Sequence, residues 1–123
     1  MTLLSHVQVV SIPVRNQDAA KAWYRDILGL HVFADEAMGP DSRWVRLGLP
    51  GSTTSVTLVT WFESMPAGSL RGLVFATPDL DAAAADLTSK GVALTPIDQQ
   101  PWGRYTTFTD PDGNGFVLQA AAH

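Results

Sequence analysis

The sequence contains no cysteine among its 123 residues. Without thiols the chain can form no disulfide framework, no zinc–thiolate site and no cysteine nucleophile. A reducing compartment permits such a composition without requiring it, so the absence leaves the compartment undecided. Three chemistries are nevertheless excluded.

Charged residues are also few, at 16% of the chain, and 12 Asp plus Glu face 8 Lys plus Arg. The formal net charge of -4 and the lack of a basic cluster argue against nucleic acid or an anionic membrane as a partner. No apolar run approaches the ~20 residues that cross a bilayer, and the first residues do not resemble a signal peptide. We therefore expect a cytoplasmic protein with no nucleic-acid or membrane partner.

Apolar side chains are abundant, at 46% of the chain, which is enough for one compact core. The length excludes an enzyme with separate cofactor and substrate domains. We expect a single domain over residues 1–123.

The chain contains an internal repeat, because residues 16–22 (NQDAAKA) recur as residues 79–85 (DLDAAAA). Asn16 and Asp79 are typical helix N-caps. Each follows a strand-like run, at residues 7–14 and 72–77, and each helix should end near a glycine, Gly29 or Gly91. Both halves therefore begin with a strand and a helix.

A second match places residues 43–51 over residues 104–113. Final strands are expected at residues 55–61 and 115–119, with a linker at residues 66–69. The pattern predicts an α+β fold made of tandem βαβββ modules, at about residues 5–63 and 70–121. Each module should be a curved mixed sheet with one helix on its outer face.

Alternation along each strand assigns side chains to the two faces of each sheet. Ile12 and Phe116 are expected to face the helices. By the same parity, the following side chains are expected on the open faces, where a cleft can form between two modules or two chains: Val9, Ser11, Pro13, Trp44, Arg46, Thr57, Val59, Trp61, Tyr105, Thr107, Gly115, Val117 and Gln119. A one-residue bulge would reverse any of these assignments.

Three stretches accompany the doubled module: FTDPDGN at residues 108–114, AWYRDILGL at residues 22–30 and PWG at residues 101–103. With them the chain resembles, over nearly its whole length, the vicinal oxygen chelate superfamily, the glyoxalase, bleomycin-resistance and extradiol-dioxygenase group. Enzymes of this superfamily hold a divalent metal through His or Glu on the first and last strands of each module. The resemblance places these four positions on Val9, Gly72 and Val117 and at or near Thr57.

None of those four residues offers the imidazole or carboxylate that such metals need. The resemblance therefore implies no metal site and no cofactor. His6 is expected on the opposite face from Val9 unless the alignment shifts, and His31 and His123 are expected in solvent. Glu36 and Glu63 are expected to be solvated charges, and no nucleophile lies beside a base.

The four tryptophans divide into two groups. Trp23 has helical spacing with Ala19, Ala22 and Ile27, which predicts a core position. The other aromatic and flexible apolar residues border the open faces, where core packing or dimer contact competes with ligand stacking: Phe33, Met38, Trp44, Trp61, Trp102 and Tyr105.

Arg46 and Arg104 are the candidate polar anchors for a ligand. Salt bridges to Asp41, Asp110 or Asp112 are the alternative role for these two arginines. Ser11, Thr57 and Thr107 could add neutral hydrogen bonds.

Two functions remain open. The first is a metal-free protein, a homodimer, that sequesters a hydrophobic, aromatic or antibiotic-like small molecule and so confers drug resistance; no catalytic residue is then needed. The second is an enzyme of the same fold, a lyase, isomerase or dioxygenase, using misaligned metal ligands or acid–base groups such as His6, Glu36 or Tyr105. The residues expected to bind the ligand are Val9, Ser11, Trp44, Arg46, Thr57, Val59, Trp61, Trp102, Tyr105, Thr107 and Val117.

Overall fold

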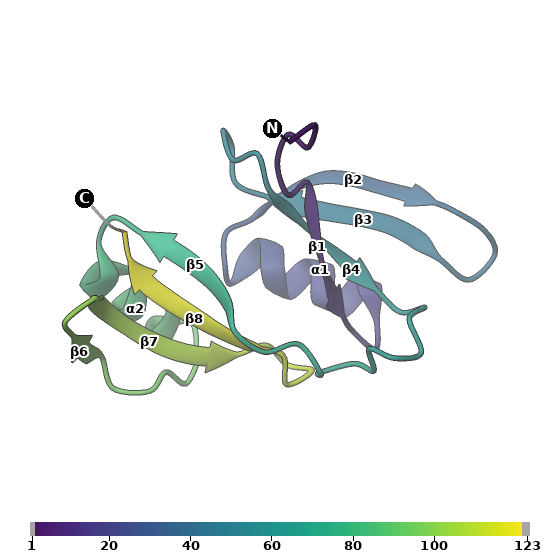
Figure 1. Cartoon of the computed structure of the whole chain (residues 1–123). Coiled ribbons are helices and arrows are strands. Elements are labelled where there is room, and N and C mark those ends of the chain that lie inside the picture. Colours follow the sequence, from purple (N-terminus) through teal and green to yellow (C-terminus); the bar gives the residue numbers. More distant parts are fainter. Residues whose placement is uncertain (1, 122–123) are drawn as a thin grey trace. The chain divides into compact units, whose positions relative to one another are not determined.

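The computed structural model describes residues 2–121 (Figure 1). The chain divides into two compact units between Ala67 and Gly68, inside the predicted linker. We call them unit 1 and unit 2 and describe each by itself. Each unit is a four-stranded mixed sheet with one helix, so the predicted α+β fold of two βαβββ modules is confirmed.

Unit 1 consists of β1 (Val9–Pro13), α1 (Gln17–Asp26), β2 (His31–Ala37), β3 (Arg43–Gly48) and β4 (Ser55–Val59). The strand order is β1-β4-β3-β2, with β1 parallel to β4 and the other pairs antiparallel. Helix α1 contacts β2, β3 and β4. The last strand is shorter than predicted, since Thr60 and Trp61 follow it outside the ladder.

Unit 2 repeats this plan with β5 (Leu73–Thr77), α2 (Leu80–Ser89), β6 (Asp98–Gln100), β7 (Gly103–Thr109) and β8 (Gly115–Ala120). The order is β5-β8-β7-β6, again with one parallel pair, β5 with β8. Helix α2 contacts β7 and β8. In residues 2–121, neither helix is long enough to span a membrane.

Both helices begin as the repeat predicts. The side chain of Asn16 accepts a hydrogen bond from the Ala19 amide at 2.9 Å, and Asp79 does the same for Ala82 at 3.0 Å. Each cap satisfies an amide that the first helical turn leaves unpaired. Gly29 and Gly91 then adopt the left-handed φ values of 75° and 88°, which other residues rarely reach, and the chain leaves each helix there.

The core of unit 1 corrects one prediction. The buried stripe of α1 is Gln17, Ala20 and Tyr24, and Tyr24 is fully buried. Trp23, predicted in the core, is only half-buried and packs edge-to-face on Tyr24 with ring centroids 5.0 Å apart. The apolar residues of this helix form two overlapping stripes, so spacing alone did not select the buried one.

The core of unit 2 is built on phenylalanine. Phe116 is 1% exposed, and its ring centroid lies 5.4 Å from that of Phe108 and 5.6 Å from that of Phe75. Leu80 and Leu87 of α2 are buried as well. The alanine-rich helix contributes little volume, so aromatic side chains from three strands fill the space.

The FTDPDGN stretch forms a turn with a buried acid at its centre. Asp110 accepts hydrogen bonds from the backbone amides of Asp112 and Asn114 and from the Asn114 side chain, all at 2.8–2.9 Å. The Asn114 side chain in turn accepts from the Leu70 amide at 3.0 Å. The turn therefore joins the start of unit 2 to the loop before β8.

Candidate functional site

The side chains on each sheet can be assigned to a face from one contact to the helix. In unit 1, Arg43 reaches Asp18 of α1, so Arg43, Val45 and Leu47 lie on the helix side. Alternation and strand register place the predicted residues of this unit together on the opposite, open face: Val9, Ser11, Pro13, Trp44, Arg46, Thr57 and Val59.

Arg46 is held at this open face by two contacts. Its Nη1 donates to the Ser55 hydroxyl at 3.0 Å, and its guanidinium lies 5.0 Å from the ring centroid of Phe33. The register between β2 and β3 shifts at Phe33, between Val32 and Ala34. A Cβ on Gly48 would come within 3.0 Å of the Phe33 ring, so glycine leaves the room for it. The bulge thus supplies the cation–π partner of Arg46.

Other predicted contacts of unit 1 are less accessible. The hydroxyls of Ser11 and Thr57 lie 3.4 Å apart, and Thr57 and Val59 are each only 1% exposed. Trp44 and Trp61 are half-buried. The Trp61 ring packs at 6.1 Å from Phe62. The open face of unit 1 therefore carries the half-buried Trp44 and Arg46, with the hydroxyls of Ser11 and Thr57 largely buried, and Trp61 follows the end of β4.

Unit 2 carries an exposed aromatic pair. Trp102, 62% exposed, stacks on Tyr105 with centroids 5.2 Å apart and an interplanar angle of 17°. The Tyr105 hydroxyl donates to Asp98 at 3.1 Å, and this hydrogen bond, reinforced by the charge of Asp98, raises the pKa of Tyr105 above its ordinary value. Tyr105 is therefore a neutral phenol at physiological pH and a poor general base.

Unit 2 also contains a cavity of about 400 Å³, whose lining residues all belong to this unit. Thr107 and Val117, both predicted, line it. Gly115, expected on the open face, and Gly72, one of the four positions named from the resemblance, line it as well. Sequence analysis did not select the remaining residues of its wall as site residues: Arg71, Ala93, Thr95, Phe108, Thr109, Gly113 and Phe116. Gly72 and Val117 are two of the four residues that the resemblance aligned with metal-ligand positions. The space beside Gly72 is open, since even a Cβ at this position would meet nothing within 4 Å.

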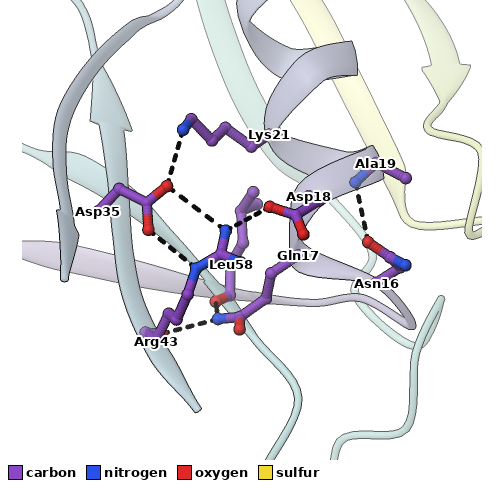
Figure 2. Close-up of polar contacts among 8 residues, drawn as sticks. All are labelled: Asn16, Gln17, Asp18, Ala19, Lys21, Asp35, Arg43 and Leu58. Atoms are coloured by element: carbon purple, nitrogen blue, oxygen red, sulfur yellow. Dashed lines mark hydrogen bonds and ion pairs between the residues drawn. The ribbon is translucent and has the colours of Figure 1, made fainter. Parts of the chain in front are cut away.

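Arg104 does not lie on the open face. It pairs with Asp81 of α2 at 3.1 Å, an acid that was not among its predicted partners. The equivalent Arg43 forms a larger network, shown in Figure 2, with Asp18 at 2.7 Å and Asp35 at 2.9 Å. Lys21 also bonds Asp35 at 2.7 Å. Arg43 lowers the pKa of Asp18, and Lys21 and then Arg43 lower that of Asp35.

No group of three His, Cys, Asp or Glu residues within the described chain, residues 2–121, could hold a metal ion. His6 is exposed and hydrogen-bonds to Ser5, and His31 is exposed at the start of β2. Glu36 and Glu63 are exposed, as expected. His123 lies outside the described residues.

Comparisons with known proteins agree with this geometry. The sequence profile of the Glyoxalase/Bleomycin resistance protein/Dioxygenase superfamily matches residues 4–118. The chain therefore belongs to this superfamily.

Similar proteins are known from several bacteria. TnmS3, an antibiotic binding protein from Streptomyces sp. CB03234, is 43% identical in sequence to this chain. Its crystal structure superposes with a TM-score of 0.93, covering 99% of this chain and 100% of TnmS3. A superfamily member from Sphaerobacter thermophilus DSM 20745 is 34% identical with a TM-score of 0.88, over 98% and 100% of the two chains. Protein YetH of Bacillus subtilis is 29% identical over 95% of this chain and 99% of its own.

Proposed function

We propose that this protein binds a hydrophobic, aromatic or antibiotic-like small molecule stoichiometrically and without a metal, so that the bound compound is sequestered unchanged. The observation that carries the proposal is the chemistry of the open faces. They carry tryptophan and tyrosine rings and an arginine, with neutral hydroxyls that are largely buried in unit 1, and the resemblance places the four metal-ligand positions of related enzymes on Val9, Gly72 and Val117 and at or near Thr57. Such a surface suits binding by burial and stacking.

The similarity to TnmS3 supports the same proposal. That protein is described as antibiotic binding, and the likeness extends over 99% of this chain at 43% identity. A ligand that stacks on two rings gains about 0.5–1.5 kcal/mol from each beyond the burial of its apolar area. Micromolar affinity corresponds to about 8 kcal/mol, so the burial of the ligand's apolar area has to supply the larger part and stacking the remainder.

Fluorescence titration tests the proposal with two probes, bleomycin and the planar aromatic polyketide emodin. We expect emodin to quench tryptophan fluorescence, with saturation at one molecule per site. Alanine at Trp44, Trp61 or Trp102, whichever ring stacks, should weaken binding about tenfold or more. Trp23→Phe is the matched control, because Trp23 packs on Tyr24 in the helix and should leave the affinity unchanged.

Two results would contradict sequestration. The first is unchanged affinity in all three alanine variants. The second is recovery of a probe chemically altered faster than in buffer, which would favour the enzyme alternative. Of the acid–base candidates for that alternative, Tyr105 is weakened by its raised pKa.

We also propose that the protein is a homodimer whose clefts are shared between chains. The open sheet faces support this, since a single module cannot bury its own open face, and a two-fold axis would give two equivalent sites. Light scattering at micromolar concentration should give twice the monomer mass. A strictly monomeric mass would place the whole cleft within one chain.

A further inference from the structure

The cavity of unit 2 contains one charged side chain in its wall, Arg71. The two N–H groups of Arg71 Nη1 are shared among three backbone carbonyls, those of Gly68, Leu70 and Gly113, at 2.6, 2.7 and 3.0 Å. These bonds fix the guanidinium at the junction of the chain before β5 and the turn before β8. The arginine is therefore oriented without help from any acid.

The remaining donors of Arg71 have no partner among residues 2–121. No carboxylate forms an ion pair with it, and neither Nε nor Nη2 makes a hydrogen bond there. By contrast Arg25, Arg43 and Arg104 each bond at least one aspartate. A planar guanidinium that presents Nε–H and Nη2–H side by side matches the two oxygens of a carboxylate.

Glycine at position 115 allows this placement of the side chain. A Cβ there would lie 3.1 Å from Cδ of Arg71, a tight contact that the side chain avoids only because residue 115 has none. The arginine stem therefore lies across the start of β8, at the wall of the cavity. An alanine at this position would force the stem to shift by a few tenths of an ångström while the positive charge is retained.

The rest of the wall is neutral. Ala93, Phe108, Phe116 and Val117 contribute apolar surface, and Thr95, Thr107 and Thr109 contribute hydroxyls. The hydroxyls of Thr95 and Thr107 form a hydrogen bond to each other at 3.0 Å, so Arg71 is the stronger hydrogen-bond donor available to a ligand. No acidic side chain lines the cavity to repel an anion. A volume of about 400 Å³ lies in the range of small-molecule sites.

We propose that this cavity recognises the acidic group of its ligand, and that Arg71 selects aromatic carboxylates over neutral molecules of the same shape. The ring system lies against the apolar wall, and the carboxylate accepts hydrogen bonds from Nε and Nη2 of Arg71. The inference rests on the proposed function, because it names the chemical class of the small molecule that unit 2 binds.

Calorimetric titration at neutral pH with 2-naphthoate and its neutral isostere 2-naphthamide tests the proposal. We expect the wild-type protein to bind the acid about tenfold more tightly than the amide. Arg71→Gln should abolish this preference while the amide affinity is retained. Arg25→Gln is the matched control, since Arg25 pairs with Asp26 on α1, and it should keep the full preference.

Gly115→Ala is a second variant, for the case that Arg71→Gln does not fold. It retains the charge of Arg71 and the atoms that bond the turn. It should reduce the preference for the acid several-fold, through the 3.1 Å contact. The proposal is overturned if the wild type does not prefer the acid, or if the preference survives both Arg71→Gln and Gly115→Ala. Emodin binding in the same preparations separates these results from a failure of sequestration itself, because the emodin titration reads the tryptophan rings.

Discussion

On the helix side of each sheet, unit 1 and unit 2 place an arginine at the same point of the repeat. Arg43 of β3 bonds Asp18 in the first turn of α1, and Arg104 of β7 bonds Asp81 in the first turn of α2. The arginine of unit 1 also bonds Asp35, whereas that of unit 2 has the single partner. The repeat has therefore kept a cross-link from helix to sheet, and unit 1 has enlarged it.

The residue before each of these aspartates differs in kind. Gln17 is buried, and its amide donates to the Leu58 and Arg43 carbonyls at 2.8 and 2.7 Å, as Figure 2 shows. The equivalent residue of unit 2 is Leu80, buried without polar contacts to the sheet. The same helix position is thus joined to the sheet by hydrogen bonds in unit 1 and by apolar packing in unit 2.

The open faces differ most. That of unit 1 has buried hydroxyls and an arginine held against Phe33, while unit 2 has an exposed Trp102–Tyr105 pair and a cavity lined by other residues, Thr107 and Val117 among them. The helix sides of the two units thus share one arginine–aspartate cross-link, whereas the open faces differ in their residues and contacts. Four predictions test where this division holds.

The largest effect is expected from Phe116→Ala in the core of unit 2. The substitution removes a ring that contacts both Phe75 and Phe108, and large-to-small changes of this kind cost about 3–5 kcal/mol. Urea denaturation measures the loss in the free energy of unfolding. Phe62→Ala, at an exposed ring, is the control and should change it by about 0.5 kcal/mol or less. A loss below about 1 kcal/mol for Phe116→Ala would contradict the assigned core.

Gln17→Leu converts the hydrogen-bonded contact of unit 1 into the apolar one of unit 2. Two backbone carbonyls lose their amide donor, and we expect a loss of about 1–3 kcal/mol, measured by the same denaturation. Leu80→Met, which keeps an apolar side chain of similar volume, is the matched change in unit 2 and should cost less. An unchanged or increased stability of Gln17→Leu would mean that packing alone suffices in both units.

The two N-caps should be equivalent. Asn16→Ala and Asp79→Ala each remove one side-chain acceptor from the first turn of a helix, and each should cost about 1 kcal/mol. Thermal melting of the two single variants and the double variant gives the comparison. If the losses in stability differ severalfold, the two cap residues are equivalent in position but not in their contribution to the stability of the fold.

The smallest effect concerns acid stability. The pKa values of Asp18 and Asp35 are lowered in the folded protein from the ordinary 3.8, so their ion pairs stabilise the fold above that pH. This contribution disappears as the pH falls through the lowered values. Arg43→Met should move the midpoint of acid unfolding, followed by circular dichroism, slightly upward.

Arg104→Met provides the control for this measurement and should move the acid midpoint less, because Arg104 bonds one exposed aspartate instead of two. Exposed ion pairs are weak, and salt should diminish both shifts. An acid midpoint that responds equally to the two substitutions would contradict the view that the larger network matters.

Sequence reasoning succeeded where a local signal has a direct physical meaning. An Asn or Asp before an apolar helix, a glycine after it and two-residue alternation in a strand depend on neighbouring backbone geometry. The caps Asn16 and Asp79, the turns at Gly29 and Gly91 and the face of Arg46 follow from such signals. The superfamily was recognised from the same repeat and its FTDPDGN turn.

Sequence reasoning failed where side chains distant along the chain had to meet. Trp23 was predicted in the core instead of Tyr24, Asp81 was not among the acids expected to pair with Arg104, and Arg71 was not selected. Arg71 belongs to no local motif, because its proposed role depends on the carbonyls of Gly68 and Gly113 and on the missing Cβ of Gly115.

The sequence by itself determined the doubled architecture and the starts and ends of its helices. Only the tertiary structure decided which arginines are neutralised by acids and which one is left facing a cavity, because that depends on contacts between segments far apart in the chain.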